Sequence, residues 1–334
     1  MLLTNLEIEN LGVEFSFNAF ENKKILITGG SGMIGSFLAE AILRTMALYG
    51  KSLANLTVTS LSGDFSNITK LSKLSQLNLI KTDLRNVSEF EQFHYIVHCA
   101  SPSNISKIGS KKNLKFANEG AIQSLAKSGT ESITFLSSGE IYGECKTPAE
   151  ESFAANVLTY AGREDYPRAK IAGEIAVRNI GLKSEANVNI IRLFHTFGPG
   201  VRVDDGRSFA DFLYSVARGE QPRLKSQGTQ IRSFMYSLDS IRGMLTCLLA
   251  GKKELICNVG SDIPMSILEF ANVVSRVGGL EGVTQVESKT YQHSPFNTLI
   301  PSTSLLRSMG WSPKVSLETG VRQSLSWIRR QSQL

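Results

Sequence analysis

Cysteine is scarce in this sequence and never closely spaced. The 334 residues include four cysteines, Cys99, Cys145, Cys247 and Cys257, and no two of them form a C-x-x-C pair. Zinc sites and the disulfide frameworks of small secreted proteins need cysteines at short, regular spacings. The sequence therefore predicts no metal site and no disulfide framework, and its scattered thiols suit the reducing cytoplasm.

Long apolar segments are also missing. No uncharged hydrophobic run approaches the ~18 residues of a membrane-spanning helix. The first seven residues include an acidic side chain where a secretory signal would be basic and then apolar. We therefore expect a cytoplasmic protein with no membrane partner.

Charge is not concentrated anywhere along the chain. The net charge is +6, from 36 Lys and Arg against 30 Asp and Glu, yet no run of five like charges occurs. This pattern argues against a nucleic-acid partner, and it suits either a phosphate-bearing ligand or ordinary surface charge. With 42% hydrophobic residues, the chain can bury the core of one large domain or of two closely joined domains.

A glycine-rich turn follows the first strongly apolar segment. Residues 24–28 predict a buried strand, and Gly29, Gly32 and Gly35 stand three apart where helical periodicity takes over. In dinucleotide-binding turns, the first glycine permits the tight turn, the second lets backbone N–H groups approach a pyrophosphate, and the third lets the helix lie close to the strand. The turn predicts a dinucleotide seat, with a purely structural turn as the alternative. The expected contacts are Gly29, Ser31, Gly32, Met33, Ile34 and Gly35.

Further strand-like segments alternate with helical ones. The additional strands are expected at residues 56–60, 79–84, 95–101 and 132–138. Five strands separated by helical segments indicate an α/β fold with a doubly wound parallel sheet, the Rossmann fold, and ligands at the carboxyl ends of its strands.

The periodicity also suggests a division of the chain. Residues 1–22 form an N-terminal extension, in which the alternating stretch 13–17 could form an edge strand or pack on the domain. Residues 23–195 form the dinucleotide-binding domain. Residues 196–334, where the periodicity is less regular, form a smaller, mixed substrate lobe interleaved with it.

The strand ends supply the other expected cofactor contacts. The second strand ends at Thr59 and Ser60, where an NAD site normally carries Asp or Glu to bind the ribose hydroxyls. Ser62 and Asp64 follow, but no acid stands at the strand end and no Arg stands beside it, so both NAD and NADP remain open. The further expected contacts are Asp83, Leu84, Cys99, Ala100, Ser101 and Asn118, of which Asp83 could equally be an exposed loop residue.

Tyr166 and Lys170 stand one helical turn apart. Pro167 is tolerated only in the first turn of a helix, so this helix begins at about residues 163–166. A phenol with its ordinary pKa of ~10 is a poor base at neutral pH unless a nearby cation stabilises the phenolate, and Lys170 could supply that cation. Ser138, at the end of the fifth strand, could bind the same substrate oxygen. A chance Tyr and Lys on one helix is the alternative.

Six stretches of sequence follow one known pattern in the same order. They are residues 29–35 (GGSGMIG), 136–143 (LSSGEIYG), Tyr166 with Lys170, 192–200 (RLFHTFGPG), 232–236 (RSFMY) and 306–313 (LRSMGWSP). Together they resemble the extended short-chain dehydrogenase/reductases, and more narrowly the nucleotide-sugar epimerase/dehydratase group. The resemblance runs from about residue 23 to the C-terminus, and between Ser138 and Lys170 it leans toward the decarboxylase-like branch.

The resemblance implies roles for several residues. Tyr166 would be the acid/base, Lys170 would bind the nicotinamide ribose and lower the pKa of the tyrosine, and Ser138 would position the sugar hydroxyl. Glu140 would be either a second acid/base or a loop carboxylate. The resemblance also implies NAD or NADP as the cofactor, with NAD favoured, a nucleotide-diphosphate sugar as the substrate, and a homodimer.

Three departures from the family pattern bear on the substrate. Gly139 and Glu140 stand where the dehydratases carry an Asp-Glu pair, which argues against elimination of water. His195 stands where the family usually has Asn, near the substrate diphosphate, and could instead be a packed residue. Residues 297–302 replace an Arg-x-x-Pro-Asp element and so remove an expected arginine. The remaining candidate phosphate ligands are Arg207 and Arg232.

The resemblance thus implies an NAD(P)-dependent enzyme acting at C4 of a nucleotide sugar, as a 4-epimerase, a uronic-acid decarboxylase or a 4-keto reductase. A 4-keto group acidifies the neighbouring C–H and makes a β-carboxylate labile, so one kind of site serves these reactions while the cofactor carries the redox step. The alternatives are a 4,6-dehydratase, a reductase of a smaller carbonyl compound and a non-catalytic dinucleotide-binding protein.

Overall fold

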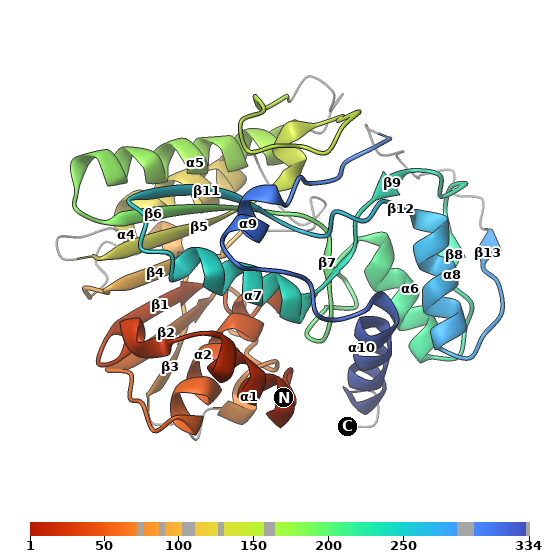
Figure 1. Cartoon of the computed structure of the whole chain (residues 1–334), viewed down its shortest axis with the longest axis horizontal. Helices are drawn as coiled ribbons and strands as arrows, with labels where there is room; N and C mark the ends of the chain where they lie inside the picture. Colours follow the sequence, from red (N-terminus) through yellow and green to blue (C-terminus); the bar gives the residue numbers. More distant parts are fainter. Residues whose placement is uncertain are drawn as a thin grey trace. The chain divides into compact units, whose positions relative to one another are not determined.

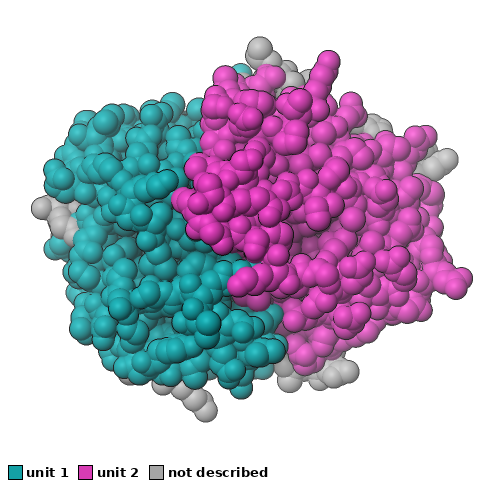
Figure 2. All heavy atoms as spheres, in the orientation of Figure 1, with its two compact units in different colours: residues 1–137, 168–192, 241–257 teal, residues 138–167, 193–240, 258–334 magenta. Residues whose placement is uncertain are grey.

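The chain folds into two compact units (Figure 2). The computed structural model describes residues 1–71, 76–86, 91–101, 111–125, 130–156, 164–285 and 297–331. The first unit comprises residues 1–137, 168–192 and 241–257, and the second comprises residues 138–167, 193–240 and 258–334. No helix in the described ranges combines the length and the apolarity that a membrane crossing requires.

A seven-stranded sheet organises the first unit (Figure 1), in the order β11-β6-β5-β4-β1-β2-β3. β1 pairs in parallel with β2 on one side and β4 on the other, and the parallel direction continues to β3 and β5. The strand order therefore reverses between β1 and β4, the point at which doubly wound sheets bind their ligands. The predicted α/β fold with a doubly wound parallel sheet is confirmed. The strands are β1 (Lys24–Thr28), β2 (Asn55–Ser60), β3 (Leu77–Lys81), β4 (Tyr95–His98), β5 (Ser132–Ser138), β6 (Asn187–Leu193) and β11 (Glu254–Val259).

Helices cover both faces of this sheet. α2 (Met33–Leu48) follows β1 and packs on β1 and β2, whereas α4 (Ala121–Leu125) and α5 (Asp165–Lys183) lie on the opposite face (Figure 1). A methyl group built on Gly173 of α5 would lie 2.3 Å from the Phe135 ring, so α5 lies very close to β5. The core on this face comprises Leu26, Phe93, Ile96, Ile122, Leu125, Ile133, Phe135, Val177, Ala186, Val188 and Ile190.

The N-terminal segment is helical and is anchored on α2. α1 (Asn5–Glu14) starts at a capping box in which Thr4 and Glu7 bond each other's backbone N–H, and the 3₁₀ turn η1 (Phe17–Phe20) follows it. Glu40 of α2 is fully buried and accepts hydrogen bonds from the Leu2 and Leu3 N–H groups, at 2.8 and 3.2 Å. The edge strand considered for residues 13–17 is wrong, because the capped helix extends to Glu14 and the next turn is 3₁₀.

The second unit combines helices with short strand pairs. α6, α8 and α10 pack against one another (Figure 1), and an aromatic cluster lies among them, in which the Phe234 and Phe270 rings stack with centroids 4.0 Å apart. Asp239 holds the C-terminal segment by accepting from the Lys314 and Val315 N–H groups, at 3.0 and 2.9 Å. The helices are α6 (Ser208–Ala217), α8 (Ile267–Val277), α9 (Ser304–Ser308) and α10 (Leu317–Gln331). The strand pairs are β7 (Thr196–Phe197) with β10 (Met235–Tyr236), β9 (Ile231–Arg232) with β12 (Met265–Ser266), and β8 (Arg223–Leu224) with β13 (Thr284–Gln285).

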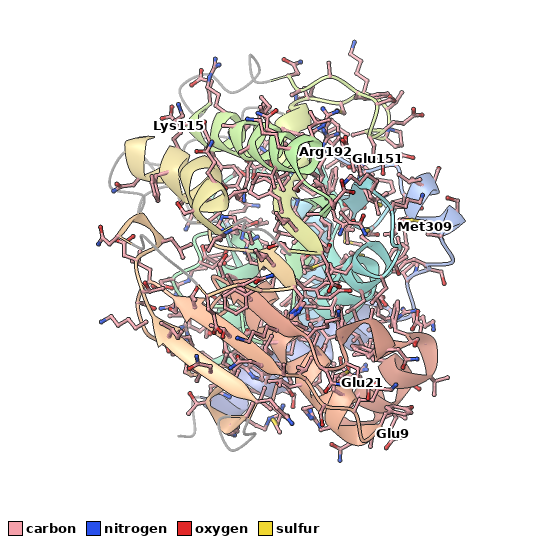
Figure 3. All side chains as sticks on the ribbon, turned by 90° about the vertical axis from the view of Figure 1, so that its left-hand side faces the viewer. Glu9, Glu21, Lys115, Glu151, Arg192 and Met309 are labelled. Atoms are coloured by element: carbon pink, nitrogen blue, oxygen red, sulfur yellow. The ribbon has the colours of Figure 1, made fainter. Side chains whose placement is uncertain are left out.

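A buried ion pair joins α5 to the sheet inside the first unit. Glu174 of α5 accepts from Arg192 Nε and Nη2, at 3.0 and 2.8 Å, and from the Ser137 hydroxyl at 2.6 Å. Arg192, which Figure 3 labels, lies on β6, and both charged side chains are 9% exposed. Because all of these bonds are charge-assisted and shielded from water, losing one partner leaves the other charge buried and uncompensated.

We expect Glu174→Ala to lower the free energy of unfolding by about 3–5 kcal/mol, because the Arg192 guanidinium would stay buried without its carboxylate. Equilibrium urea unfolding measures the loss. The matched control is Arg178→Ala on the same helix, which breaks an exposed pair with Glu254 and should cost less than about 1 kcal/mol. Equal losses in the two variants would contradict the role given to the buried pair.

Candidate active site

The glycine turn after β1 brings backbone segments closer together than side chains would allow. Gly29 has φ +66°, and a methyl group built on it would lie 2.6 Å from Ala100 Cα at the end of β4. A methyl group on Gly35 would lie 2.7 Å from Gly30 Cα. These two glycines therefore let the turn contact β4 and let α2 start directly against the turn, as the spacing predicts.

Gly32 occupies a different position in this turn. It is the N-cap residue of α2, and a methyl group on it would meet only the Gly29 carbonyl oxygen, at 3.3 Å. The first N–H groups of α2, beginning with Met33 and Ile34, have no partner within the helix, and the helix dipole adds positive potential there. Bare backbone at a helix N-terminus fits the pyrophosphate of a dinucleotide.

The end of β2 carries hydroxyl groups beside this turn. The Ser60 hydroxyl donates to the Ser31 Oγ at 2.8 Å, and the Thr59 carbonyl accepts from the Gly30 N–H at 3.0 Å. Asp83 follows β3 and precedes the 3₁₀ turn η3, which starts at Leu84. The structure therefore brings Ser31 of the glycine turn together with Thr59 and Ser60 at the end of β2.

His98 joins Thr28, the last residue of β1, to the Ala117 carbonyl beyond β4, and sequence reasoning missed it. Its Nε2 lies 2.7 Å from the Ala117 carbonyl oxygen, so Nε2 carries the proton and Nδ1 accepts from the Thr28 hydroxyl at 2.8 Å. Burial lowers the pKa of His98 to about 4, with the Lys170 charge acting in the same direction. Thr28 also accepts from the Ala100 N–H at 3.4 Å. Neutral His98 thus positions the segment Cys99–Ser101 beside Gly29; a buried His directly after Val97 was the available signal.

Asn118 lies in a π-helical turn. Residues Phe116–Gly120 form this turn between α3 (Lys111–Lys115) and α4, and Asn118 is fully buried. Its Nδ2 donates to the Leu114 carbonyl at 2.8 Å, while its Oδ1 has no partner among the described residues. π turns occur frequently at functional sites, and an orphaned buried oxygen is costly unless a ligand or water meets it.

Lys170 is buried against β5. Its Nζ donates to the Leu136 carbonyl at 2.7 Å and lies 5.1 Å from the centre of the Phe135 ring. Burial lowers the pKa of Lys170 to about 7, against the opposing effects of Cys99 and Glu174. Burial also raises the pKa of the Cys99 thiol to about 12, which keeps it from acting as a nucleophile at neutral pH.

Ser138, Glu140 and Tyr166 meet within the second unit. Ser138 caps the 3₁₀ turn η6 (Gly139–Tyr142) by accepting from the Glu140 N–H at 3.2 Å, and its hydroxyl also bonds Tyr166. Burial raises the pKa of Tyr166 above its ordinary value and the Glu140 charge adds to this, whereas the Ser138 bond and the Arg207 charge oppose it. α5 begins at Asp165, so Tyr166 and Pro167 lie in its first turn, as predicted.

The predicted phosphate ligands of the second unit already have partners. Arg207 Nε and Nη2 donate to Asp205 at 2.5 and 2.8 Å, a bidentate pair that sequence reasoning did not predict. Arg232 is buried and donates from Nη1 to the Ile231 and Asn297 carbonyls, at 2.7 and 2.9 Å. Burial and the charges of Arg232 and Arg207 lower the pKa of His195 to about 3, so His195 is neutral at working pH.

The segment that replaces the expected arginine is held through its main chain, by the Glu144 carboxylate and by backbone partners. Glu144 accepts from the Asn297 and Thr298 N–H groups, at 2.5 and 3.1 Å. The Cys145 N–H donates to the Thr298 carbonyl at 3.1 Å, and the Ile231 N–H donates to the Asn297 carbonyl at 2.7 Å. Residues 297–301 therefore lie beside β9, where the Asn297 carbonyl orients Arg232.

These features define a dinucleotide-binding α/β protein with a Tyr-x-x-x-Lys helix. The chain belongs to the NAD dependent epimerase/dehydratase family, whose sequence model matches residues 25–260. This confirms the family resemblance drawn from the sequence motifs.

The chain is also similar to curated relatives in sequence and to solved structures in fold. UDP-glucuronic acid decarboxylase 6 of Arabidopsis thaliana is 28% identical over 308 residues, which cover 90% of this chain and 87% of the relative. UDP-glucuronic acid decarboxylase 1 of Xenopus tropicalis is 26% identical over 316 residues, covering 93% and 73%. The UDP-glucuronic acid 4-epimerase of Bacillus cereus, solved with UDP-glucuronic acid and NAD, superposes with a TM-score of 0.79 at 22% identity, covering 92% of this chain and 99% of that one. It has the same fold.

We expect His98→Gln to reduce the acid sensitivity of folding. Because the pKa of His98 is about 4 in the fold and ~6.5 in the unfolded chain, the unfolded state binds more protons between these values, and stability falls as pH drops through this window. Glutamine keeps a donor and an acceptor but takes up no proton. Urea unfolding at several pH values from 6.5 to 4 should show a slope shallower by up to about 1.4 kcal/mol per pH unit; an unchanged slope would contradict a neutral His98.

Proposed function

We propose that this protein is a nucleotide-sugar decarboxylase that oxidises C4 of a UDP-linked uronic acid and releases its carboxylate as CO₂. The observation that carries the proposal is the Ser138–Tyr166 hydrogen bond at the start of α5, the helix that carries Lys170 one turn further on. The glycine turn supports a dinucleotide cofactor. The names of the decarboxylase relatives support the substrate class.

Each proposed step assigns a proton to a residue of this chain. A bound nicotinamide supplies hydride transfer from and back to the sugar. Tyr166 accepts the proton of the C4 hydroxyl while Ser138 holds the same oxygen. The bond between C5 and the carboxylate carbon then breaks, CO₂ leaves, and the electron pair moves onto the C4 oxygen, which Tyr166 and Ser138 stabilise. Glu140 first takes up a proton from solvent and delivers it to C5, so that one proton is consumed for each CO₂ released. As the hydride returns to C4, Tyr166 gives its proton back to the C4 oxygen.

The burial and charges around Tyr166 explain why proton transfer to its hydroxyl needs a cation nearby. The raised pKa of Tyr166 keeps the phenol protonated at neutral pH, so proton transfer requires positive charge near its oxygen. We assign this charge to Lys170, together with ribose binding. With a pKa of about 7, the ammonium is close to its titration midpoint, and an anionic ligand nearby would favour its charged form.

We assign the diphosphate to Arg232 and His195, with Arg207 as a secondary contact. Arg232 is a buried cation whose Nη1 is oriented by the Ile231 and Asn297 carbonyls, and electrostatic attraction to an anion is strong at a buried position. Arg207 is weaker in this role because Asp205 already neutralises it. Neutral His195 can donate a hydrogen bond without adding charge.

A UDP-sugar 4-epimerase is the second candidate, because a 4-epimerase shares this fold across 92% of the chain. A 4-keto reductase is the third. We also propose that the protein works as a homodimer in the cytoplasm, which rests on the family resemblance and on the wide spacing of its four cysteines. Light scattering of the purified protein tests the dimer.

Incubation with UDP-glucuronic acid and NAD, followed by mass spectrometry, separates these reactions. A product lighter by one CO₂ supports the decarboxylase. An isomer of unchanged mass would identify the epimerase, and a product lighter by two hydrogens with net accumulation of NADH, the reverse of 4-keto reduction, would identify the reductase. Either of these two results would overturn the proposal.

We expect Tyr166→Phe to lower kcat by about 10²–10⁴-fold, because the phenol is the only group assigned to the C4 proton. Binding of NAD, measured by calorimetry, should persist, because the glycine turn is unchanged. Tyr49→Phe is the matched control. Tyr49 is exposed, its hydroxyl donates a long bond of 3.4 Å to the Glu9 carbonyl, and loss of this hydroxyl should leave turnover unchanged. Full activity in Tyr166→Phe would remove the proposed base.

A further inference from the structure

The carboxyl end of β2 carries a group of hydroxyls where a carboxylate is usual. Ser60, the last residue of β2, is buried, and its hydroxyl donates to Ser31 Oγ at 2.8 Å. The Ser60 and Ser62 oxygens are 3.2 Å apart, and the Gly63 N–H donates to Ser60 Oγ at 3.2 Å. In doubly wound sheets this strand end meets the adenosine ribose.

An acidic residue at this point would bind the 2′-hydroxyl of the ribose and repel a 2′-phosphate. The nearest acid along the chain is Asp64, four residues beyond Ser60. Its Oδ1 accepts from the Ser66 N–H at 3.1 Å, and its own N–H donates to Ser62 Oγ at 3.1 Å. Asp64 is thus used within its own turn, while the strand end presents neutral hydroxyls.

Lys81 supplies a positive charge on the strand that neighbours Ser60. It is the last residue of β3 and the register partner of Ser60, and the Thr82 N–H donates to the Ser60 carbonyl at 2.9 Å. Register partners on neighbouring strands face the same side of a sheet. A methyl group built on Gly63 would lie 2.7 Å from Lys81 Cδ, so the lysine stem lies over the turn that follows Ser60.

We propose that this serine–lysine cluster, Ser31, Ser60, Ser62 and Lys81, binds the 2′-phosphate of NADP, so that the protein binds NADP at least as tightly as NAD. The phosphate monoester carries up to two negative charges and three acceptor oxygens, which match hydroxyl donors and an ammonium group. The inference rests on the proposed dinucleotide seat and extends it to the choice of cofactor. It makes Ser60 and Lys81 the specificity-determining residues.

Calorimetric titration of the whole protein with NADP and with NAD tests this directly. Lys81→Gln should raise the Kd for NADP about tenfold, the usual value of one charge-assisted contact, and change the Kd for NAD less than twofold. Ser60→Asp should reverse the preference by repelling the phosphate and accepting from the 2′-hydroxyl. Lys70→Gln, at an exposed lysine of the 3₁₀ turn η2 (Thr69–Leu71), is the matched control and should alter neither Kd.

Smaller ligands separate the phosphate site from the reaction. Adenosine 2′,5′-bisphosphate should raise the melting temperature of the wild type more than adenosine 3′,5′-bisphosphate or inorganic phosphate does, and Lys81→Gln should remove this difference. Equal shifts with all three probes would indicate a general anion site and overturn the inference. An NADP Kd tenfold above the NAD Kd in the wild type would also overturn it.

Failure of this inference and failure of the proposed function give different results. CO₂ release with NAD, combined with weak NADP binding, would leave the function intact and reject the serine–lysine cluster. Lys81-dependent binding of adenosine 2′,5′-bisphosphate without turnover of any UDP-sugar would support the serine–lysine cluster and reject the proposed function.

Discussion

The first unit depends on the contact of bare backbone at the turn between β1 and α2. A side chain at Gly29 would overlap Ala100 of β4, and one at Gly35 would overlap Gly30 of the turn itself. Only with hydrogen at both positions can α2 begin where β1 ends, beside the point at which the strand order reverses. This constraint aims the N-terminus of α2 at the ligand position of the fold, and the proposed cofactor chemistry depends on it.

The hydrogen bonds and pKa values of the buried polar groups around this turn depend on burial and on their immediate neighbours. His98 is neutral because it is buried between an acceptor carbonyl and a hydroxyl, and it ties β1 to the π turn that contains Asn118. Burial lowers the pKa of Lys170, and Glu174 forms a buried ion pair with Arg192. The first unit therefore stabilises its own polar core, whereas in the second unit burial and the Glu140 charge raise the pKa of Tyr166 and keep its phenol protonated.

Sequence patterns predict those features of the structure that depend on residues close together in the chain. The apolar strands, the glycine turn and the start of α5 at Asp165 follow from periodicity, glycine spacing and the position of Pro167. The bidentate pairing of Arg207 with Asp205, the link from His98 to Ala117 and the register of Lys81 beside Ser60 each require knowledge of which segments meet, which one sequence does not contain. Residues 13–17 show the opposite case. Their alternation suggested a strand, but the capping box of Thr4 and Glu7 starts a helix that extends to Glu14.

Hydrogen exchange at the glycine turn tests the central claim most directly. If the turn and the first residues of α2 hold the pyrophosphate, saturating NAD or NADP should slow exchange of the backbone amides of residues 30–34 more than that of any other segment of the first unit. Dinucleotide binding that leaves these amides unprotected, or that protects only distant segments, would contradict the account.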